Sequence, residues 1–273
     1  MRRLNPIAVL ACAALLSSCS LFDENAVQDI TGPAPTDSRI KFYNFGVNSP
    51  GVNFYADDVK MTAISTTRCV APVPADTAAC RAAGIESTTG IAYAGQSAGG
   101  LYSAITPGAH TITGRIAAAT DNGLAISTVA GTIESGKYYS FYQSGIYNAT
   151  TKTIDAFLIE DALPTGAPDF TKAQVRFVNA VSNGTGDLNL FATNTTTTTE
   201  SPVGGPIAYK GVSGWVALDE GTYNIRAAYS GAGTNLVTRN TISLLGGRVY
   251  TITVRGSTAT ASTLGLDLTA NQQ

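Results

Sequence analysis

Charged side chains and histidine are scarce in this sequence of 273 residues. Asp, Glu, Lys and Arg make up 13% of the chain, about half of their share in an average soluble protein. The chain holds a single histidine, which excludes a metal site built from several histidines and a mechanism with two catalytic histidines. Two whole classes of catalytic site are therefore absent.

Motifs that bind phosphate or nucleotides are also missing. Neither a Gly-Lys-Ser/Thr phosphate loop nor a Gly-x-Gly-x-x-Gly turn appears in the sequence, and both would be expected of a nucleotide-binding domain. Removal of Arg2 and Arg3 with an export signal leaves 15 basic against 19 acidic residues. This acidic balance argues against nucleic acid as a partner. We predict no cofactor and no metal site.

His110 is the residue on which a catalytic triad would have to depend. It lies within an alternating, strand-like run, and no nucleophile-elbow motif accompanies it. Adjacent acidic residues such as Asp57-Asp58 and Glu160-Asp161 are interpreted as solvated turn residues. We therefore predict that His110 is a surface or half-buried residue and that the protein is not an enzyme.

The N-terminus has the pattern of a lipoprotein signal peptide. Two arginines precede an apolar run from Ile7 to Leu16, which is too short to span a bilayer. The run ends in Leu16-Ser17-Ser18-Cys19, which resembles the bacterial lipobox. We predict a signal peptide over residues 1–18 and palmitate-type acylation of Cys19, which would anchor the chain in a membrane. The alternative is an ordinary secretory signal.

The residues after Cys19 predict a location and a tether. Ser20, which is not Asp, resembles an outer-membrane sorting signal; whether the protein faces the periplasm or the cell surface stays open. Residues 19–37 have little periodicity and contain a cluster of proline and glycine, which is typical of a linker.

Cys69 and Cys80 are the other cysteines of the exported chain. In an oxidising compartment, two such cysteines predict a disulfide. A loop of this length would stabilise the fold by roughly 3 kcal/mol. Two free thiols are the alternative.

The rest of the chain repeats itself. Ile40-Lys-Phe-Tyr-Asn44 matches Val175-Arg-Phe-Val-Asn179, and Ile91-Ala-Tyr-Ala-Gly95 matches Ile207-Ala-Tyr-Lys-Gly211. Further matched segments keep the same order, so we predict two tandem domains at residues 38–161 and 172–270. The connection at 162–171, rich in proline and glycine, is interpreted as a hinge.

Short alternating runs between turn residues predict an all-β chain. No stretch shows sustained helical periodicity, and Asp121-Asn122-Gly123 is typical of a hairpin turn. Each copy holds seven or eight short strands, which favours an immunoglobulin-like or transthyretin-like antiparallel β-sandwich. A small barrel is the alternative.

The run Val212-Ser-Gly-Trp-Val-Ala-Leu-Asp-Glu-Gly-Thr-Tyr223, between Val175–Asn179 and Gly247–Gly256, carries a family resemblance. It resembles the bacterial domain of unknown function 4397 family. The resemblance implies exported β-sandwich modules, often tandem and lipid-anchored, and supplies no catalytic residues.

Aromatic side chains are the best candidates for a binding surface. In the alternating pattern, Tyr139 and Phe141 face the core, so Tyr138 and Tyr142 point outward from the first domain. With Tyr147 they could form a stacking platform for a glycan. Trp215 and its repeat counterpart Tyr102 are further candidates. The alternative is that Tyr138 and Tyr142 cover the seam between the domains or cap a sheet edge, and that Trp215 and Tyr102 close the end of each core.

These observations predict a non-enzymatic, lipid-anchored protein of the cell envelope that acts through binding surfaces, in adhesion, in a matrix or in an envelope complex. An envelope protein or a polysaccharide would be its partner. The alternative function is a glycan-binding accessory module that uses the exposed aromatics of the first domain.

Overall fold

The computed structural model describes residues 38–62 and 90–271. These residues belong to one compact unit. Almost every element is a strand, and within the described ranges the only helical segment is the short 3-10 turn η2 (Ser97–Gly100). Across these same ranges, no helix has the length and apolar character needed to cross a bilayer. The prediction of an all-β chain is confirmed.

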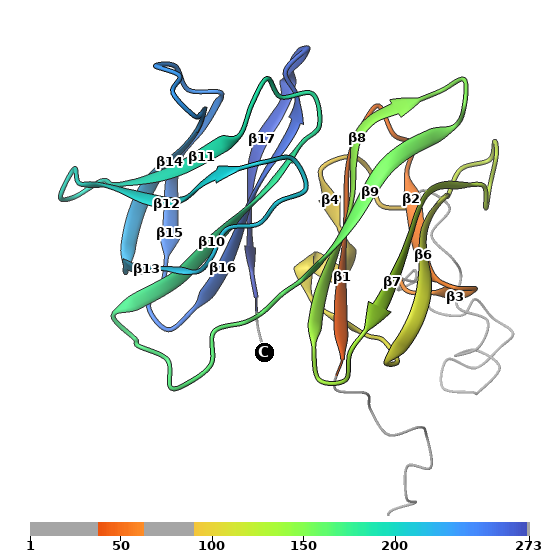
Figure 1. The fold of residues 1–273 in the computed structure, drawn as a ribbon, viewed down its shortest axis with the longest axis horizontal. Helices are drawn as coiled ribbons and strands as arrows, with labels where there is room; N and C mark the ends of the chain where they lie inside the picture. Colours follow the sequence, from red (N-terminus) through yellow and green to blue (C-terminus); the bar gives the residue numbers. More distant parts are fainter. Residues whose placement is uncertain (1–37, 63–89, 272–273) are drawn as a thin grey trace, which may run out of the picture. The chain divides into compact units, whose positions relative to one another are not determined.

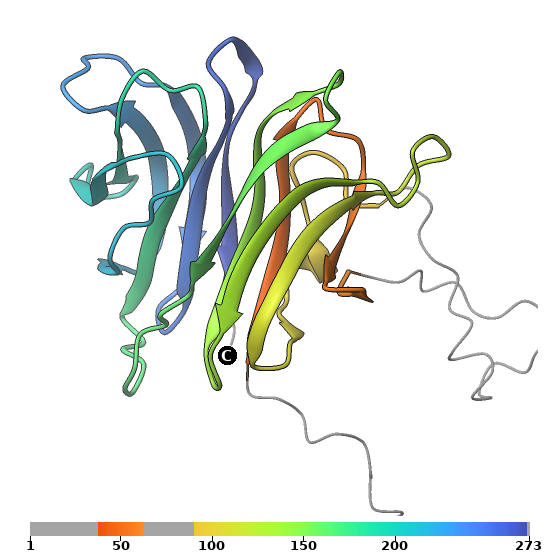
Figure 2. The ribbon, with the colours of Figure 1, turned by 45° about the vertical axis from the view of Figure 1, so that its right-hand side comes forward.

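The first half of the described chain forms two facing sheets (Figures 1 and 2). One sheet has the order β4-β1-β8-β9, with β5 also paired to β1, and the other has the order β3-β2-β6-β7. The strands are β1 (Arg39–Val47), β2 (Val52–Ala56), β3 (Val59–Lys60), β4 (Gly95–Gln96), β5 (Ser103–Ala104), β6 (Gly108–Ile116), β7 (Ala125–Ile133), β8 (Tyr138–Asn148) and β9 (Thr153–Glu160).

The second half repeats this arrangement. Its sheets have the orders β13-β10-β16-β17 and β12-β11-β14-β15. The strands are β10 (Lys172–Val181), β11 (Leu188–Asn194), β12 (Glu200–Ile207), β13 (Val216–Asp219), β14 (Gly221–Tyr229), β15 (Val237–Leu244), β16 (Val249–Ser257) and β17 (Thr260–Ala270). The strands β1, β8 and β9 correspond to β10, β16 and β17, and β13 pairs with β10 at the place where β5 pairs with β1.

The first and penultimate strands of each half pair in parallel. Ile40 lies beside Tyr139 in the β1–β8 ladder, and Val175 lies beside Tyr250 in the β10–β16 ladder. An immunoglobulin constant domain has an ABED sheet against a CFG sheet, which differs from the order found here. All four sheets are open, with two edge strands each, so neither half is the small barrel that was the alternative prediction.

The repeat extends to individual hydrogen bonds. The amide Nδ2 of Asn44 donates to Ile91 O (2.8 Å), and Nδ2 of Asn179 donates to Ile207 O (3.0 Å). These bonds tie the first strand of each half to its matched Ile-Ala-Tyr segment. The duplication seen in the sequence is thus a duplication of contacts.

Each half has its own apolar core between its two sheets. Phe42 of β1 and Phe54 of β2 stack in the first core with ring centroids 5.2 Å apart, and Phe141 of β8 packs beside both. The β-branched and aromatic residues of these strands supply this face because alternate side chains point to one side of a sheet.

The predicted β6–β7 hairpin is present. Its turn takes positive φ at Asp121 (59°) and Gly123 (80°). Asp tolerates this left-handed region better than most residues, and Gly has no side chain to clash there.

Candidate functional site

The outer face of the β4-β1-β8-β9 sheet is an aromatic surface covered by the second sandwich. Tyr43 and Tyr142 stack with centroids 4.6 Å apart and planes inclined by 6°, and Phe157 stacks on Tyr142 at 5.0 Å. These side chains form one buried cluster with Val178 and Ala180 of β10. We call this contact between the two sandwiches the seam.

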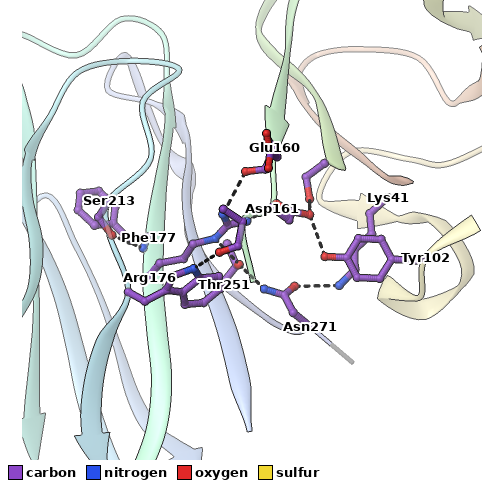
Figure 3. Close-up of polar contacts among 12 residues, drawn as sticks. Lys41, Tyr102, Glu160, Asp161, Arg176, Phe177, Ser213, Thr251 and Asn271 are labelled. Carbon is purple, nitrogen blue, oxygen red and sulfur yellow. Dashed lines mark hydrogen bonds and ion pairs between the residues drawn. The ribbon is translucent and has the colours of Figure 1, made fainter. Parts of the chain in front are cut away.

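A buried ion pair crosses the seam (Figure 3). The Arg176 guanidinium, with 3% of its side chain exposed, donates to the fully buried carboxylate of Asp161. Asp161 also accepts hydrogen bonds from Ser140 Oγ (2.6 Å) and Tyr102 OH (2.8 Å). Arg176 lies over the Trp215 ring, with its guanidinium carbon 4.7 Å from the ring centroid. The pair is well partnered, as a buried charge must be.

Lys41 crosses the seam in the opposite direction. Its Nζ donates to Asn271 Oδ1 (2.9 Å) and Ala270 O (3.1 Å), and it lies 4.1 Å from the centroid of the Tyr102 ring. Burial lowers the pKa of the Lys41 ammonium to about 8; the nearby Asp161 carboxylate opposes this shift, and the Arg176 cation adds to it.

These two contacts are equivalent under the repeat. Lys41 and Arg176 occupy matching positions of β1 and β10, since each pairs with the matching residue of β8 or β16. Asp161 and Asn271 also match, because each donates its backbone N–H to the residue that begins the neighbouring strand. Each sandwich therefore reaches across to the end of the last strand of the other.

The predicted aromatic platform is not present. Tyr142 has no exposed surface, because the face that points away from the first core is the face that the second sandwich covers. Tyr138 packs edge-on against Tyr102 (5.0 Å), and Tyr147 packs against the first core. The rings of Tyr102 and Trp215 lie against the cations of the seam, Lys41 and Arg176. The burial of Tyr142 at the seam is what the alternative interpretation expected.

The sequence interpretation missed the charged residues of the seam. It treated Glu160-Asp161 as solvated, whereas Asp161 is 2% exposed because Arg176 brings it into the interface. A signal was available: Lys41 and Arg176 are charges with an apolar residue on either side, at matched positions of the repeat. Such a residue needs a buried partner.

His110 is held by acceptors on both sides. Its Nδ1 lies 2.8 Å from Asp57 Oδ2, and its Nε2 lies 2.8 Å from Thr106 O. Asp57 also accepts from Thr111 N (2.9 Å). The pKa of Asp57 is lowered first by that backbone bond and then by His110. A neutral imidazole has one N–H, so it can donate to only one of these two acceptors at a time.

A cavity of about 410 Å³ lies beside the connection between β9 and β10. This volume is in the range of small-molecule sites. Its lining comprises Pro164, Thr165, Gly166, Ala167, Pro168, Asp169, Lys172, Gln174, Gly247, Arg248, Val249, Ala270 and Asn271. Next to it, the Phe170 side chain is 75% exposed. A Cβ on Gly247, which has φ +73°, would stand 2.8 Å from the Phe170 ring, so the ring rests on glycine backbone.

The two cations of this cavity differ in their partners. Lys172 Nζ donates to Asp219 Oδ1 at 2.5 Å, and the pKa of Lys172 is raised by this bond. For the Arg248 guanidinium, no hydrogen bond or ion pair is formed with any residue that the structure describes. Arg248 is thus a cation at the cavity with no anionic partner in the described chain.

Several expectations fall outside the described residues. Cys19, Cys69 and Cys80 all do, so the acylation and the disulfide stay predictions. Within residues 38–62 and 90–271, no three side chains of His, Cys, Asp or Glu come together as a metal site would require.

Residues 173–273 match the family described as domain of unknown function 4397. The resemblance expected from sequence is confirmed for this part of the chain, which corresponds to the second sandwich. The first sandwich lies outside the match. A comparison with curated proteins returned no match.

Two solved structures align over most of this chain. One is the Bacillus anthracis TIE protein, at 11% identity and a TM-score of 0.23, covering 80% of this chain and 33% of that one. The chain thus spans about a third of the length of that protein. The other is a candidate cell adhesion protein from Bacteroides ovatus, at 11% identity and a TM-score of 0.24, covering 88% of this chain and 97% of that one.

Proposed function

We propose that this protein is a non-enzymatic, lipid-anchored protein of the cell envelope that acts by binding, with its two sandwiches as one rigid body. The observation that carries the proposal is the seam. Among the described residues, the buried charged side chains are Lys41, Asp161 and Arg176, and all three join one sandwich to the other. Their role is to hold a fixed shape, and a fixed shape suits a binding surface because little order is lost on association.

The acylation pattern at Leu16–Cys19 supports the location of this body. Residues 20–37 would act as the linker between the lipid and the first strand.

Metabolic labelling with an alkyne palmitate tests the anchor. The wild-type chain should take up the label and appear in the membrane fraction, and Cys19→Ser should lose both properties. Label on the Cys19→Ser variant would contradict the assigned site. Ser18→Ala is a matched control, because alanine is also small and should leave acylation intact.

Protease treatment of intact cells then places the body. Digestion without lysis would put it on the cell surface, and the partners to screen are external. Protection until the outer membrane is opened would put it in the periplasm, and an envelope complex becomes the target. Hydrolytic turnover that disappears in His110→Ala would overturn the non-enzymatic proposal.

A further inference from the structure

A cation that occupies equivalent positions in the two sandwiches has a carboxylate partner in the first sandwich only. In the first, Lys137 Nζ donates to Glu160 Oε1 at 2.7 Å. Arg248 is the equivalent of Lys137, since both follow the glycine of the turn before β8 or β16. Glu160 pairs with Tyr139 in its ladder, as Ala270 pairs with the equivalent Tyr250. The second sandwich therefore keeps the cation and has alanine where the first has the carboxylate.

Arg248 and Ala270 both line the 410 Å³ cavity. The place that a carboxylate fills in the first sandwich is thus part of a ligand-sized space in the second. We propose that this cavity binds a carboxylated saccharide, with the sugar carboxylate on the Arg248 guanidinium. This inference rests on the proposed binding function and names its ligand class.

Arginine suits this role because its planar fork can pair with both oxygens of a carboxylate. The other charges at the cavity are already engaged. Lys172 is paired with Asp219. Asp169 accepts two hydrogen bonds from Thr171, from its N (2.9 Å) and its Oγ1 (2.7 Å). Arg248 is the cation of this lining without an anionic partner among the described residues, and Asp169 keeps its negative charge nearby. One such cation beside a carboxylate favours a ligand with a single carboxylate over a polyphosphate.

The neighbouring side chains favour a sugar as the carrier of that carboxylate. The exposed Phe170 ring, supported by Gly247, offers a flat apolar face of the kind on which a sugar ring can stack. Gln174 lines the cavity, and its amide makes no side-chain hydrogen bond within the described residues. It can both donate to and accept from hydroxyl groups.

Calorimetry on the detergent-solubilised, full-length protein tests the proposal. The probe is a galacturonic acid trisaccharide, compared with its methyl ester and with sodium acetate. We expect the acid to bind, the ester to bind at least about tenfold more weakly, and acetate alone not to compete at millimolar concentration, since charge-assisted hydrogen bonds carry that much affinity. Equal binding of acid and ester would overturn the role of the carboxylate. Full competition by acetate would reduce the site to a simple anion site.

Two variants separate the site from general charge effects. Arg248→Ala should weaken binding at least about tenfold, whereas Lys137→Ala, the matched change in the first sandwich, should leave it unchanged. Ala270→Glu should supply Arg248 with an internal carboxylate and block the ligand while the cation is still present. Thermal unfolding of each variant shows whether it is folded.

Unchanged affinity in folded Ala270→Glu would overturn the assigned cavity. Failure of the acid trisaccharide to bind the wild-type chain would overturn the ligand class. Neither result would affect acylation or protease accessibility, so the proposed envelope function fails or stands on separate measurements.

Discussion

The seam contains two equivalent contacts, Arg176 with Asp161 and Lys41 with Asn271, which we call its two arms. They share their geometry and differ in charge. In one arm the cation of the second sandwich, Arg176, lies against the carboxylate of Asp161. In the other, Lys41 of the first sandwich lies against the amide of Asn271. A buried cation is costly unless an anion partners it, and Lys41 has only neutral oxygens as its direct acceptors. The pKa of Lys41 falls to about 8 as a result of its burial. The repeat thus preserves a contact while changing how its charge is compensated.

The largest effect should come from breaking the charged arm. Asp161→Ala leaves the Arg176 guanidinium buried without its anion, which costs about 3–5 kcal/mol. Asn271→Ala removes a neutral partner at the equivalent position and should cost about 1–3 kcal/mol. Urea unfolding of the two full-length variants measures the difference. Equal losses of stability would mean that the anion of Asp161 contributes no more than the amide of Asn271, which would contradict this prediction.

The arm formed by Lys41 and Asn271, which has no anion, should make the stability of the fold depend on pH. The pKa of Lys41 is about 8 in the folded chain, against an ordinary value of 10.5, which we take for the unfolded chain. Between pH 8 and 10.5, the unfolded chain therefore keeps a proton on Lys41 that the folded chain has lost. Stability therefore rises with pH across this window. Relative to Lys41→Met, the wild-type free energy of unfolding should rise by about 2 kcal/mol between pH 7.5 and 9.5. Parallel curves for the two proteins would contradict the buried ammonium.

The fold was accessible from sequence because its signals are local and occur twice. Alternation in β8 places Tyr139 and Phe141 in the first core, and the matched segments around Asn44 and Asn179 make equivalent hydrogen bonds. Because the sequence is repeated, the alternation in one copy can be compared with the alternation in the other. An accidental pattern in one copy is then recognised by its absence from the other. The strand order itself required the structure, since a parallel β1–β8 pair leaves no mark in either strand.

The seam was not accessible in the same way. Alternation shows which side chains leave a core, and it does not show whether they then meet solvent or another sheet. Tyr142 points away from the first core and is still fully buried. The informative sign was the apolar character of both faces of β1, where Phe42 faces the core and Tyr43 the seam. Strands covered on both sides show such continuous runs.

One further substitution makes the Lys41 contact resemble the Arg176 contact. Asn271→Asp would give Lys41 a carboxylate, as Asp161 gives Arg176. An anion at this distance favours the ammonium and raises the pKa of Lys41. The rise in stability between pH 7.5 and 9.5 should then shrink to less than half of the wild-type rise, measured by the same urea titrations. An undiminished rise would show that burial alone, without regard to the acceptor, governs this lysine.

The smallest effect concerns the exposed pair of the first sandwich. Lys137 and Glu160 have 44% and 37% of their side chains exposed, and solvent screens such pairs strongly. Lys137→Ala should therefore leave the urea midpoint within experimental error. The same reasoning implies that the second sandwich loses no appreciable stability by having Ala270 in place of a glutamate, so Arg248 is free to serve a ligand. The contrary result is a clear drop in the urea midpoint for Lys137→Ala with no such drop for Arg248→Ala. The carboxylate of Glu160 would then serve to stabilise the first sandwich. Its replacement by Ala270 would no longer be a reason to place a carboxylate ligand on Arg248.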